Sequence, residues 1–328
     1  MKYAVPSKLR RTLNAFAAAS NIVVWPSWPQ ACMRPGWRLH PDTEAVIQAS
    51  AHLTTSVAPE RIRDELIGML AEPAAASGLR TLDRLGVLAV LLPESVPMRA
   101  TTQPLPHHFD VWEHSLRAVE GVDALLAGLD ALAPWGPVLR EHLMLDLGGG
   151  LTRREVLKLA ALLHDVAKPE TRADVGGRIR FIGHDTVGGR RAGEIARRFR
   201  LSRHAAQVLE RLVAEHLRPM HLAQAGLITR RARFRFWRAL GDEAQDLLLL
   251  ALADAAALDG ASPLAVWAAA VASPALLRGE DVMAVFGVPP GPEVGRLLAL
   301  AREAQALGLV STREEALALL RRKTERGT

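Results

Sequence analysis

The chain has 328 residues, of which 49% are hydrophobic, so it is not a wholly disordered protein and has material for two or three helical units. Alanine and leucine dominate and aromatic residues make up only 5%, a bias that favours helix over sheet. The 41 Lys and Arg residues against 35 Asp and Glu give a net charge of +6. Arginine supplies most of the positive charge, which suits phosphate binding, but charge alone favours an ordinary salt-bridged surface.

Compartment and membrane association follow from simple counts. Cys32 is the only cysteine, which excludes an intrachain disulfide and a thiolate zinc cluster. The N-terminus lacks the apolar core of a signal peptide, and no apolar run approaches the roughly 20 residues that span a bilayer. We therefore expect a cytoplasmic protein that does not associate with a membrane.

The first third of the chain divides at prolines. Residues 1–38 contain Pro26, Pro29 and Pro35 and are expected to be irregular. Residues 39–97 are expected to form a helical unit, with a helix that Asp42 or Thr43 caps and another that begins at Pro59. The polar, proline-bearing stretch from Met98 to Pro106 is typical of a linker.

The remaining sequence predicts helices joined by short breaks. A long helix over VWEHSLRAVEGVDALLAGL is followed by one from Thr152 to Pro169 and by a small hairpin over residues 172–182, with Gly176-Gly177 as its turn. Further helices are expected over residues 184–199, 204–217, 231–241 and 246–258, and a helical tail over residues 261–328. The predicted fold class is all-α with one minor β-hairpin.

Four residues interrupt apolar helices in a way that points to chemistry. His114 lies within the long helix, His164 and Asp165 follow LKLAALL, and Asp254 interrupts the most hydrophobic helix. A buried carboxylate is costly unless a metal ion or a cationic side chain compensates its charge. Adjacent helical residues point about 100° apart, so His164 and Asp165 reach one ion only near a helix end, and Pro169 places such an end nearby.

Each of these residues also has an ordinary structural explanation. A single buried histidine is more often a hydrogen-bonded core residue than a ligand, and Asp254 could pair with an arginine. The four residues together, on three separate apolar helices, favour a divalent ion bound by imidazole and carboxylate groups.

The order His114, His164-Asp165, Asp254 resembles that of the HD superfamily of metal-dependent phosphohydrolases. More closely, HHFDVWEHSL, LAALLHDVAKPETR, GRIRFIGHDTVG and EHLRP resemble the HD region of bacterial tRNA nucleotidyltransferases (CCA-adding enzymes) and poly(A) polymerases, and LHPDTEAVIQASAHLTTSVAPERIRDELIGML resembles their RNA-binding neck. The resemblance covers roughly residues 39–257 and implies an HD-domain helical core over residues 98–260, preceded by a helical neck over residues 39–97.

The resemblance also implies a set of site residues. The metal ligands would be His114, His164, Asp165 and Asp254, with His184 and His216 as additional ligands of a second ion and Asp165 as the bridge between the ions. Asp165 and Lys168 would be catalytic, with Lys168 and Arg172 contacting a substrate phosphate. His184 could equally belong to a turn before a helix that Asp185 caps, and His107 and His108 are better explained as structural residues.

Two features limit the resemblance. Residues 1–40 contain no Gly-Ser followed by Asp-x-Asp, so we expect that this chain alone lacks the nucleotidyltransferase head and does not add nucleotides. Arg61 and Arg63 of the neck could bind RNA, but ERIRDEL is also an ordinary surface helix with i, i+3 and i, i+4 charge pairs. The aromatic residues of RARFRFWRALG could stack bases, although core packing is the favoured explanation.

We therefore predict a metal-dependent phosphodiesterase or phosphatase that acts on nucleotides or on phosphates at RNA ends, with tRNA as one possible substrate. The metal could be Mn, Mg, Ni, Co, Fe or Zn, since all of these accept histidine and aspartate ligands. The alternative is an RNA-binding accessory module whose metal site is structural or regulatory.

Overall fold

A computed structural model describes residues 39–224, 230–258, 276–306, 310 and 312–325. The predicted irregular segment 1–38, with Cys32, lies outside these residues. The chain divides into two compact units, which we call unit 1 (Met1–Leu217 and Gln245–Leu264) and unit 2 (Arg218–Ala244 and Ala265–Thr328). Helices dominate the described part, whose β-structure consists of two small antiparallel hairpins, so the all-α prediction is confirmed. No helix in the described ranges has the length and apolar character needed to cross a bilayer.

The helical neck of unit 1 follows the proline and glycine signals closely. Its elements are α3 (Pro41–Ser50), the 3-10 helix η1 (Ala51–Ser56), α4 (Pro59–Ala71), α5 (Ala75–Arg84), α6 (Val87–Leu91) and α7 (Ser95–Arg99). Helix α4 begins at Pro59 as predicted. The cap of α3 differs, because His40 is the N-cap and its Nδ1 accepts a hydrogen bond from the Asp42 amide at 3.3 Å. The stretch predicted as a linker is therefore helical up to Arg99.

The second part of unit 1 contains the helices predicted to carry the chemistry. They are α8 (Val111–Ala127), η2 (Leu129–Leu132), α9 (Gly136–Leu143), α10 (Arg153–Leu163), α11 (Lys168–Thr171), α12 (His184–Arg198), α13 (Arg203–Ala214) and α16 (Glu243–Ala257). Helix α10 is buried along its length and packs against α8, α13 and α4, which makes it the centre of the core.

Helix α10 is shorter than predicted. A capping box between Thr152 and Glu155 starts it, and Glu155 Oε2 accepts from the Thr152 amide at 2.7 Å. It ends at Leu163, before Pro169 is reached, and continues as a turn in which the Lys168 amide donates to the Asp165 carbonyl. His164 and Asp165 therefore lie directly after the last helical residue, at the kind of helix end that the sequence predicted for them.

Glycines allow two close helix contacts next to this turn. A Cβ at Gly121 of α8 would lie 3.0 Å from the Ala253 Cα of α16, and a Cβ at Gly189 of α12 would lie 2.7 Å from the Ala214 Cβ of α13. Such close approaches require a residue without a side chain. The first contact brings the helix of His114 against the helix of Asp254, and the second brings α12 against α13.

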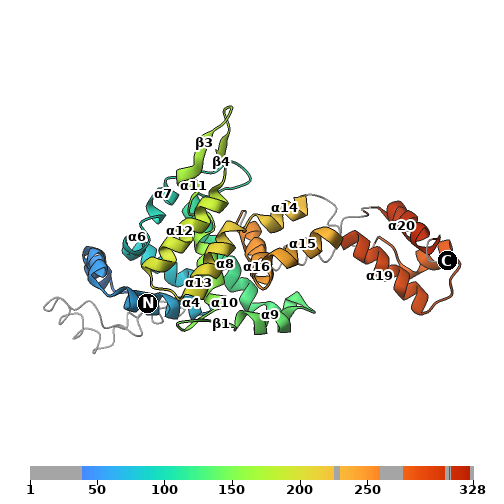
Figure 1. Ribbon diagram of the computed structural model, residues 1–328, viewed down its shortest axis with the longest axis horizontal. Coiled ribbons are helices and arrows are strands. Elements are labelled where there is room, and N and C mark those ends of the chain that lie inside the picture. The colour runs from blue at the N-terminus through green and yellow to red at the C-terminus, as the bar shows by residue number, and fades with distance from the viewer. Residues whose placement is uncertain (1–38, 225–229, 259–275, 307–309, 311, 326–328) are drawn as a thin grey trace. The chain divides into compact units, whose positions relative to one another are not determined.

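Two hairpins complete unit 1. Strands β3 (Arg172–Asp174) and β4 (Ile179–Phe181) pair as predicted, with Ala173 opposite Arg180, and extend away from the helices of this unit (Figure 1). A second hairpin, β1 (Asp146–Gly148) with β2 (Leu151–Thr152), was not predicted. Its glycines indicated only a break between helices, because strands of two or three residues have no readable period.

Unit 2 contains α14 (Arg218–Gln224), α15 (Arg230–Leu240), α18 (Gly279–Phe286), α19 (Pro292–Ala306) and α20 (Arg313–Glu325). The last three helices form a small apolar core that includes Val282, Leu297 and Leu320. The prediction that the aromatic residues of α15 are core residues is wrong for two of three. Phe236 is buried, but 63% of Phe234 and 45% of Trp237 are exposed, because these two residues lie three apart on another face of the helix.

Candidate metal centre

The structure brings all six predicted ligand side chains together inside unit 1. They come from α8 (His114), the turn after α10 (His164 and Asp165), the first residue of α12 (His184), the turn after α13 (His216) and α16 (Asp254). The five residues other than Asp254 are at most 8% exposed, and the Asp254 side chain is 26% exposed. Segments separated by up to 140 residues in sequence therefore meet at one place.

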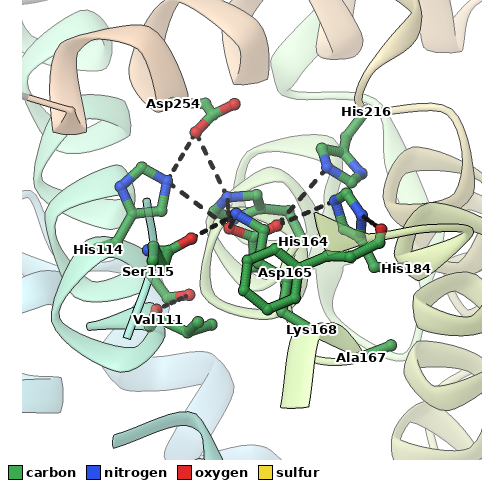
Figure 2. Close-up of polar contacts among 12 residues, drawn as sticks. Val111, His114, Ser115, His164, Asp165, Ala167, Lys168, His184, His216 and Asp254 are labelled. Carbon is green, nitrogen blue, oxygen red and sulfur yellow. Dashed lines mark hydrogen bonds and ion pairs between the residues drawn. The ribbon is translucent and has the colours of Figure 1, made fainter. Parts of the chain in front are cut away.

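Three of these residues form a first group, His114, His164 and Asp254 (Figure 2). Asp254 Oδ1 lies 2.8 Å from His114 Nε2 and 3.4 Å from His164 Nε2. One potential ligand atom from each residue lies within 4.8 Å of the others. Two imidazoles and a carboxylate are thus directed at a common point.

The second group consists of Asp165, His184 and His216. Asp165 Oδ1 lies 3.4 Å from His184 Nε2 and 3.8 Å from His216 Nε2. The other carboxylate oxygen, Oδ2, lies 3.2 Å from His164 Nε2 and 3.8 Å from His114 Nε2. One oxygen of Asp165 therefore faces each group, and its carboxylate lies between the two.

Backbone hydrogen bonds orient three of the four imidazoles. The Nδ1 atoms of His164, His184 and His216 lie 2.8, 2.7 and 2.7 Å from the carbonyl oxygens of Ala161, Phe181 and Val213, each three residues earlier. A carbonyl accepts only, so Nδ1 carries a proton, and in the neutral ring Nε2 keeps a lone pair directed into the site. Helix α12 has Gly183 as its N-cap, so the alternative in which Asp185 caps that helix does not hold.

The charges of the site are not balanced by its fixed cation. Two carboxylates, Asp165 and Asp254, lie against one ammonium group, that of Lys168 at 2.7 Å from Asp165 Oδ2. Desolvation by burial would lower the pKa of His164, but Asp165 and Asp254 outweigh it and raise this pKa to about 10. Burial would likewise raise the pKa of Asp165, but His164 and Lys168 hold it well below its usual range. The cluster thus attracts additional positive charge.

Lys168 is held by a residue that sequence reasoning missed. The Lys168 Nζ donates to Gln103 Oε1 at 2.6 Å and lies 5.5 Å from the centre of the Phe181 ring. The Gln103 amide in turn donates to the Phe109 carbonyl at 3.3 Å. Gln103 belongs to the stretch expected to be a linker, and nothing in the local sequence distinguishes it from other polar loop residues.

Two further predicted residues differ in their placement. His107 lies beside the site, with its ring centre 5.1 Å from that of His114, and burial, Lys168 and His114 lower its pKa to about 4. Arg172 begins β3 and is exposed. His107 fits the structural role expected of it, while the structure gives Arg172 no contact with the carboxylates of the cluster.

The two neck arginines differ from each other. Arg61 is exposed on α4. Arg63 donates through Nη1 to the Arg200 carbonyl at 3.1 Å and through Nη2 to Asp64 Oδ1 at 2.7 Å, which connects the neck to the turn before α13. Arg63 therefore has a structural contact that the sequence did not reveal.

The donor set fits a divalent metal ion. Within the described ranges, the inward Nε2 atoms of His164, His184 and His216 and the Oδ1 atom of Asp165 are buried without a hydrogen-bond partner. Buried polar atoms are rarely left unpaired, and imidazole nitrogens with carboxylate oxygens are good ligands for borderline and hard divalent ions. The unpaired atoms, the excess of carboxylates and the fixed imidazole orientations agree with this interpretation.

Comparison with protein families assigns this region to a known class. The family described as "HD domain" matches residues 111–261, which include all six residues of the two groups. The family described as "Probable RNA and SrmB- binding site of polymerase A" matches residues 36–98.

Individual proteins extend this relation along the chain. The chain is 35% identical over 312 residues to the A-adding tRNA nucleotidyltransferase of Deinococcus radiodurans, which covers 88% of this chain and 64% of that protein. It is 38% identical over 283 residues to the CC-adding tRNA nucleotidyltransferase of Thermus thermophilus, which covers 82% of this chain and 58% of that protein. The bifunctional uridylyltransferase/uridylyl-removing enzyme of Ruegeria pomeroyi is 27% identical over 205 residues, 60% of this chain and 20% of that enzyme. The chain is thus similar to tRNA nucleotidyltransferases over about three fifths of their length, and it matches an HD domain family and an RNA-binding family.

Proposed function

We propose that unit 1 is a metal-dependent phosphohydrolase, a phosphodiesterase or phosphatase that acts on nucleotides or on phosphates at RNA ends. The observation that carries the proposal is the Asp165 carboxylate between two groups of histidine and aspartate side chains whose inward atoms are buried and unpaired. His114, His164 and Asp254 would hold one ion and His184 and His216 a second, with Asp165 shared. Bound divalent ions lower the pKa of water and polarise phosphoryl oxygens.

Lys168 is the residue that we expect to contact the substrate phosphate. An ammonium group has three donors, of which Asp165 and Gln103 engage two. The third donor is then directed by the first two contacts, and it would bind a non-bridging phosphoryl oxygen and stabilise its developing negative charge. The 6% exposure of Lys168 limits competition from water for this contact.

The comparisons support an activity at phosphorus, but they include both the addition and the removal of nucleotidyl groups. Two relatives are named for adding nucleotides to tRNA, and the name of another includes the removal of a uridylyl group, which is a cleavage at phosphorus. We propose hydrolysis because the only histidine–carboxylate groups of metal-ligating arrangement in the described residues are those of the HD domain. We also propose that residues 39–97 act as the RNA-binding neck and residues 98–260 as the hydrolytic domain.

The test is hydrolysis of 2′,3′-cyclic AMP and of a chromogenic phosphodiester by the metal-free protein supplemented in turn with Mn, Mg, Ni, Co, Fe and Zn. Metal-dependent turnover in the wild type that is absent in Asp165→Ala is the expected result. Turnover that persists in Asp165→Ala would reject the assignment, because this carboxylate lies between both groups.

A second candidate function rests on the match of residues 36–98 to an RNA-binding family. In this alternative the chain is an RNA-binding accessory module and the metal is structural or regulatory. Metal binding and tRNA binding without hydrolysis of any of these substrates would favour the second candidate over the first.

A further inference from the structure

The β3–β4 hairpin carries a set of charges that the proposed site does not use. Lys168 is the first residue of α11, β3 follows this helix directly, and β4 ends three residues before His184. The hairpin is therefore a direct extension of the two chain segments that enter the candidate metal centre. It projects from the helices of unit 1 (Figure 1).

Three exposed arginines lie on this hairpin, Arg172, Arg178 and Arg180. No carboxylate among the described residues lies within ion-pairing distance of their guanidinium groups. The hairpin's one acidic residue, Asp174, instead accepts a hydrogen bond from the Gly177 amide at 2.8 Å and so stabilises the turn. Within the described part of the chain, the guanidinium groups of the hairpin therefore have no ion-pair partner.

Several other arginines of the same unit are neutralised by nearby carboxylates. Arg191 of α12 pairs with Glu170 and Glu194, Arg198 pairs with Glu94, and Arg80 pairs with Glu113 and Glu120. The described residues therefore supply carboxylates to these helical arginines but not to the guanidinium groups of the hairpin. Unpaired guanidinium groups are suited to phosphate, which they bind through two parallel hydrogen bonds.

The register of the strands decides how these charges are arranged. Cross-strand partners share a face, so Arg180 lies on the face of Ala173, and Arg172 lies on the other face with Phe181, whose ring contacts Lys168. Arg178, at the turn, is about three residues or roughly 10 Å farther out than Arg172 at 3.3 Å per strand residue. Charges spread over this length fit a chain of phosphates better than one terminal phosphate.

We propose that the β3–β4 hairpin is an arm that binds the phosphate backbone of an RNA chain whose terminal phosphate occupies the candidate metal centre. This inference rests on the proposed function and narrows its substrate class from nucleotides in general to oligonucleotide ends. Lys168 holds the terminal phosphate and the hairpin arginines hold phosphates farther along the chain. The sequence match of residues 36–98 to an RNA-binding family adds a second surface of the same preference within unit 1.

The experiment compares two substrates with the same reacting end, 2′,3′-cyclic AMP and an eight-residue oligoribonucleotide that ends in an adenosine 2′,3′-cyclic phosphate. The variant is Arg178→Glu with Arg180→Glu, each also made singly. Arg140→Glu is the control for single charge reversal, because Arg140 is 55% exposed on α9 and pairs only with Asp130 in the described structure.

The double variant should show a roughly tenfold lower kcat/KM on the oligonucleotide, through KM, and no change on 2′,3′-cyclic AMP, since a backbone contact raises affinity without touching the reacting phosphate. The slope of log affinity against log salt should fall by about one for each arginine removed. Arg140→Glu should leave kcat/KM unchanged on both substrates. Equal reductions on both substrates, or no reduction on the oligonucleotide, would overturn the proposal.

Direct binding separates this inference from the proposed function. Fluorescence anisotropy with the same oligonucleotide, labelled and ending in a 3′-phosphate, reports the hairpin contact whether or not turnover occurs. Weaker binding by the double variant in a protein without hydrolytic activity would support the arm and reject the hydrolase. Unchanged binding would reject the arm, and would leave an acidic protein as the partner to seek.

Discussion

Helix α16 carries two aspartates eight residues apart, and each faces a histidine, yet their surroundings differ. Asp246 is fully buried, with Oδ2 2.6 Å from Arg153 Nη1 and 3.1 Å from His142 Nε2. Asp254 meets His114 and His164 but no arginine in the described residues. A buried carboxylate with a guanidinium partner is already neutralised, whereas one surrounded by imidazoles is not. Of the two His–Asp contacts on this helix, the one without a guanidinium partner belongs to the candidate metal centre, and the one with a guanidinium partner does not.

The largest effect is expected from Asp165→Ala, which tests the metal centre because it removes the carboxylate between the two groups of ligands. Because removal of a group that merely supports a ligand costs 10–100-fold, removal of this one should lower metal affinity and turnover by more than about 100-fold. Isothermal titration with Mn²⁺ and the phosphodiester assay measure the two effects. Far-UV circular dichroism should show unchanged helical content, and a collapse of that signal would mean that Asp165 is needed for folding.

Arg153→Met tests the other aspartate of α16, Asp246, by removing its guanidinium partner. It leaves Asp246 buried without its guanidinium, which should lower the free energy of unfolding by about 3–5 kcal/mol. Guanidinium chloride titration monitors this decrease, and the difference between variant and wild type should be the same with and without metal. Arg140→Met removes an exposed ion pair as the matched control and should cost less than about 1 kcal/mol. Rescue of Arg153→Met by metal would erase the contrast between the two regions.

Metal removal sharpens the comparison in the intact chain. A divalent ion at about 100 times its dissociation constant should stabilise the protein by about 2.7 kcal/mol, because the unfolded chain lacks the assembled site. Thermal unfolding with Mn²⁺ and with a chelator should show this gain in the wild type and in Arg153→Met, but not in Asp165→Ala. A gain of equal size in all three proteins would place the ion elsewhere.

Gln103→Leu tests the fixed cation of the metal centre. Without the Gln103 hydrogen bond, Lys168 keeps only Asp165 as a partner and its third donor is no longer directed, so kcat should fall about tenfold, at the lower end of the effects seen for supporting residues. Metal affinity should stay within about twofold, since Gln103 contacts no ligand atom of the two groups. Parallel titration and kinetics separate the two quantities, and a decrease confined to metal affinity would contradict this role.

The smallest effect is expected from Arg61→Ala with Arg63→Ala. This pair should weaken RNA binding several-fold and reduce the salt slope by about one for each of these arginines that binds a phosphate, while hydrolysis of the small phosphodiester stays intact. Each single variant serves as a control, because only Arg63 holds the Arg200 carbonyl. Hydrolysis and RNA binding that fall together would show that the neck supports the HD domain structurally.

The sequence predicted what depends on local pattern. Pro59 and the apolar period located helices, and charged residues within apolar helices pointed to His114, His164, Asp165 and Asp254. The structure brings these residues together, while their metal-binding role stays a prediction. Residues whose function depends on distant partners could not be found this way. Gln103 accepts a hydrogen bond from Lys168, 65 residues away, and Arg63 donates one to a carbonyl 137 residues away.

The aromatic residues of α15 show the limit of assigning burial from residue type. Phe234 and Trp237 are exposed although hydrophobicity favoured the core for them. Which face of a helix is buried depends on the neighbouring elements, and in α15 the buried residues Phe236 and Leu240 lie four apart on one face, which excludes Phe234 and Trp237.

The hydrogen bonds from the imidazole Nδ1 atoms to carbonyls three residues earlier have a consequence for how this centre changes over time. Each of His164, His184 and His216 is aimed by its own stretch of backbone and not by a side chain elsewhere in the protein. A segment of only four residues therefore contains both the ring and the carbonyl that fixes the orientation of the ring. Substitutions in the surrounding helices can reshape the pocket without turning a ligand away, which gives such a centre freedom to acquire new substrates.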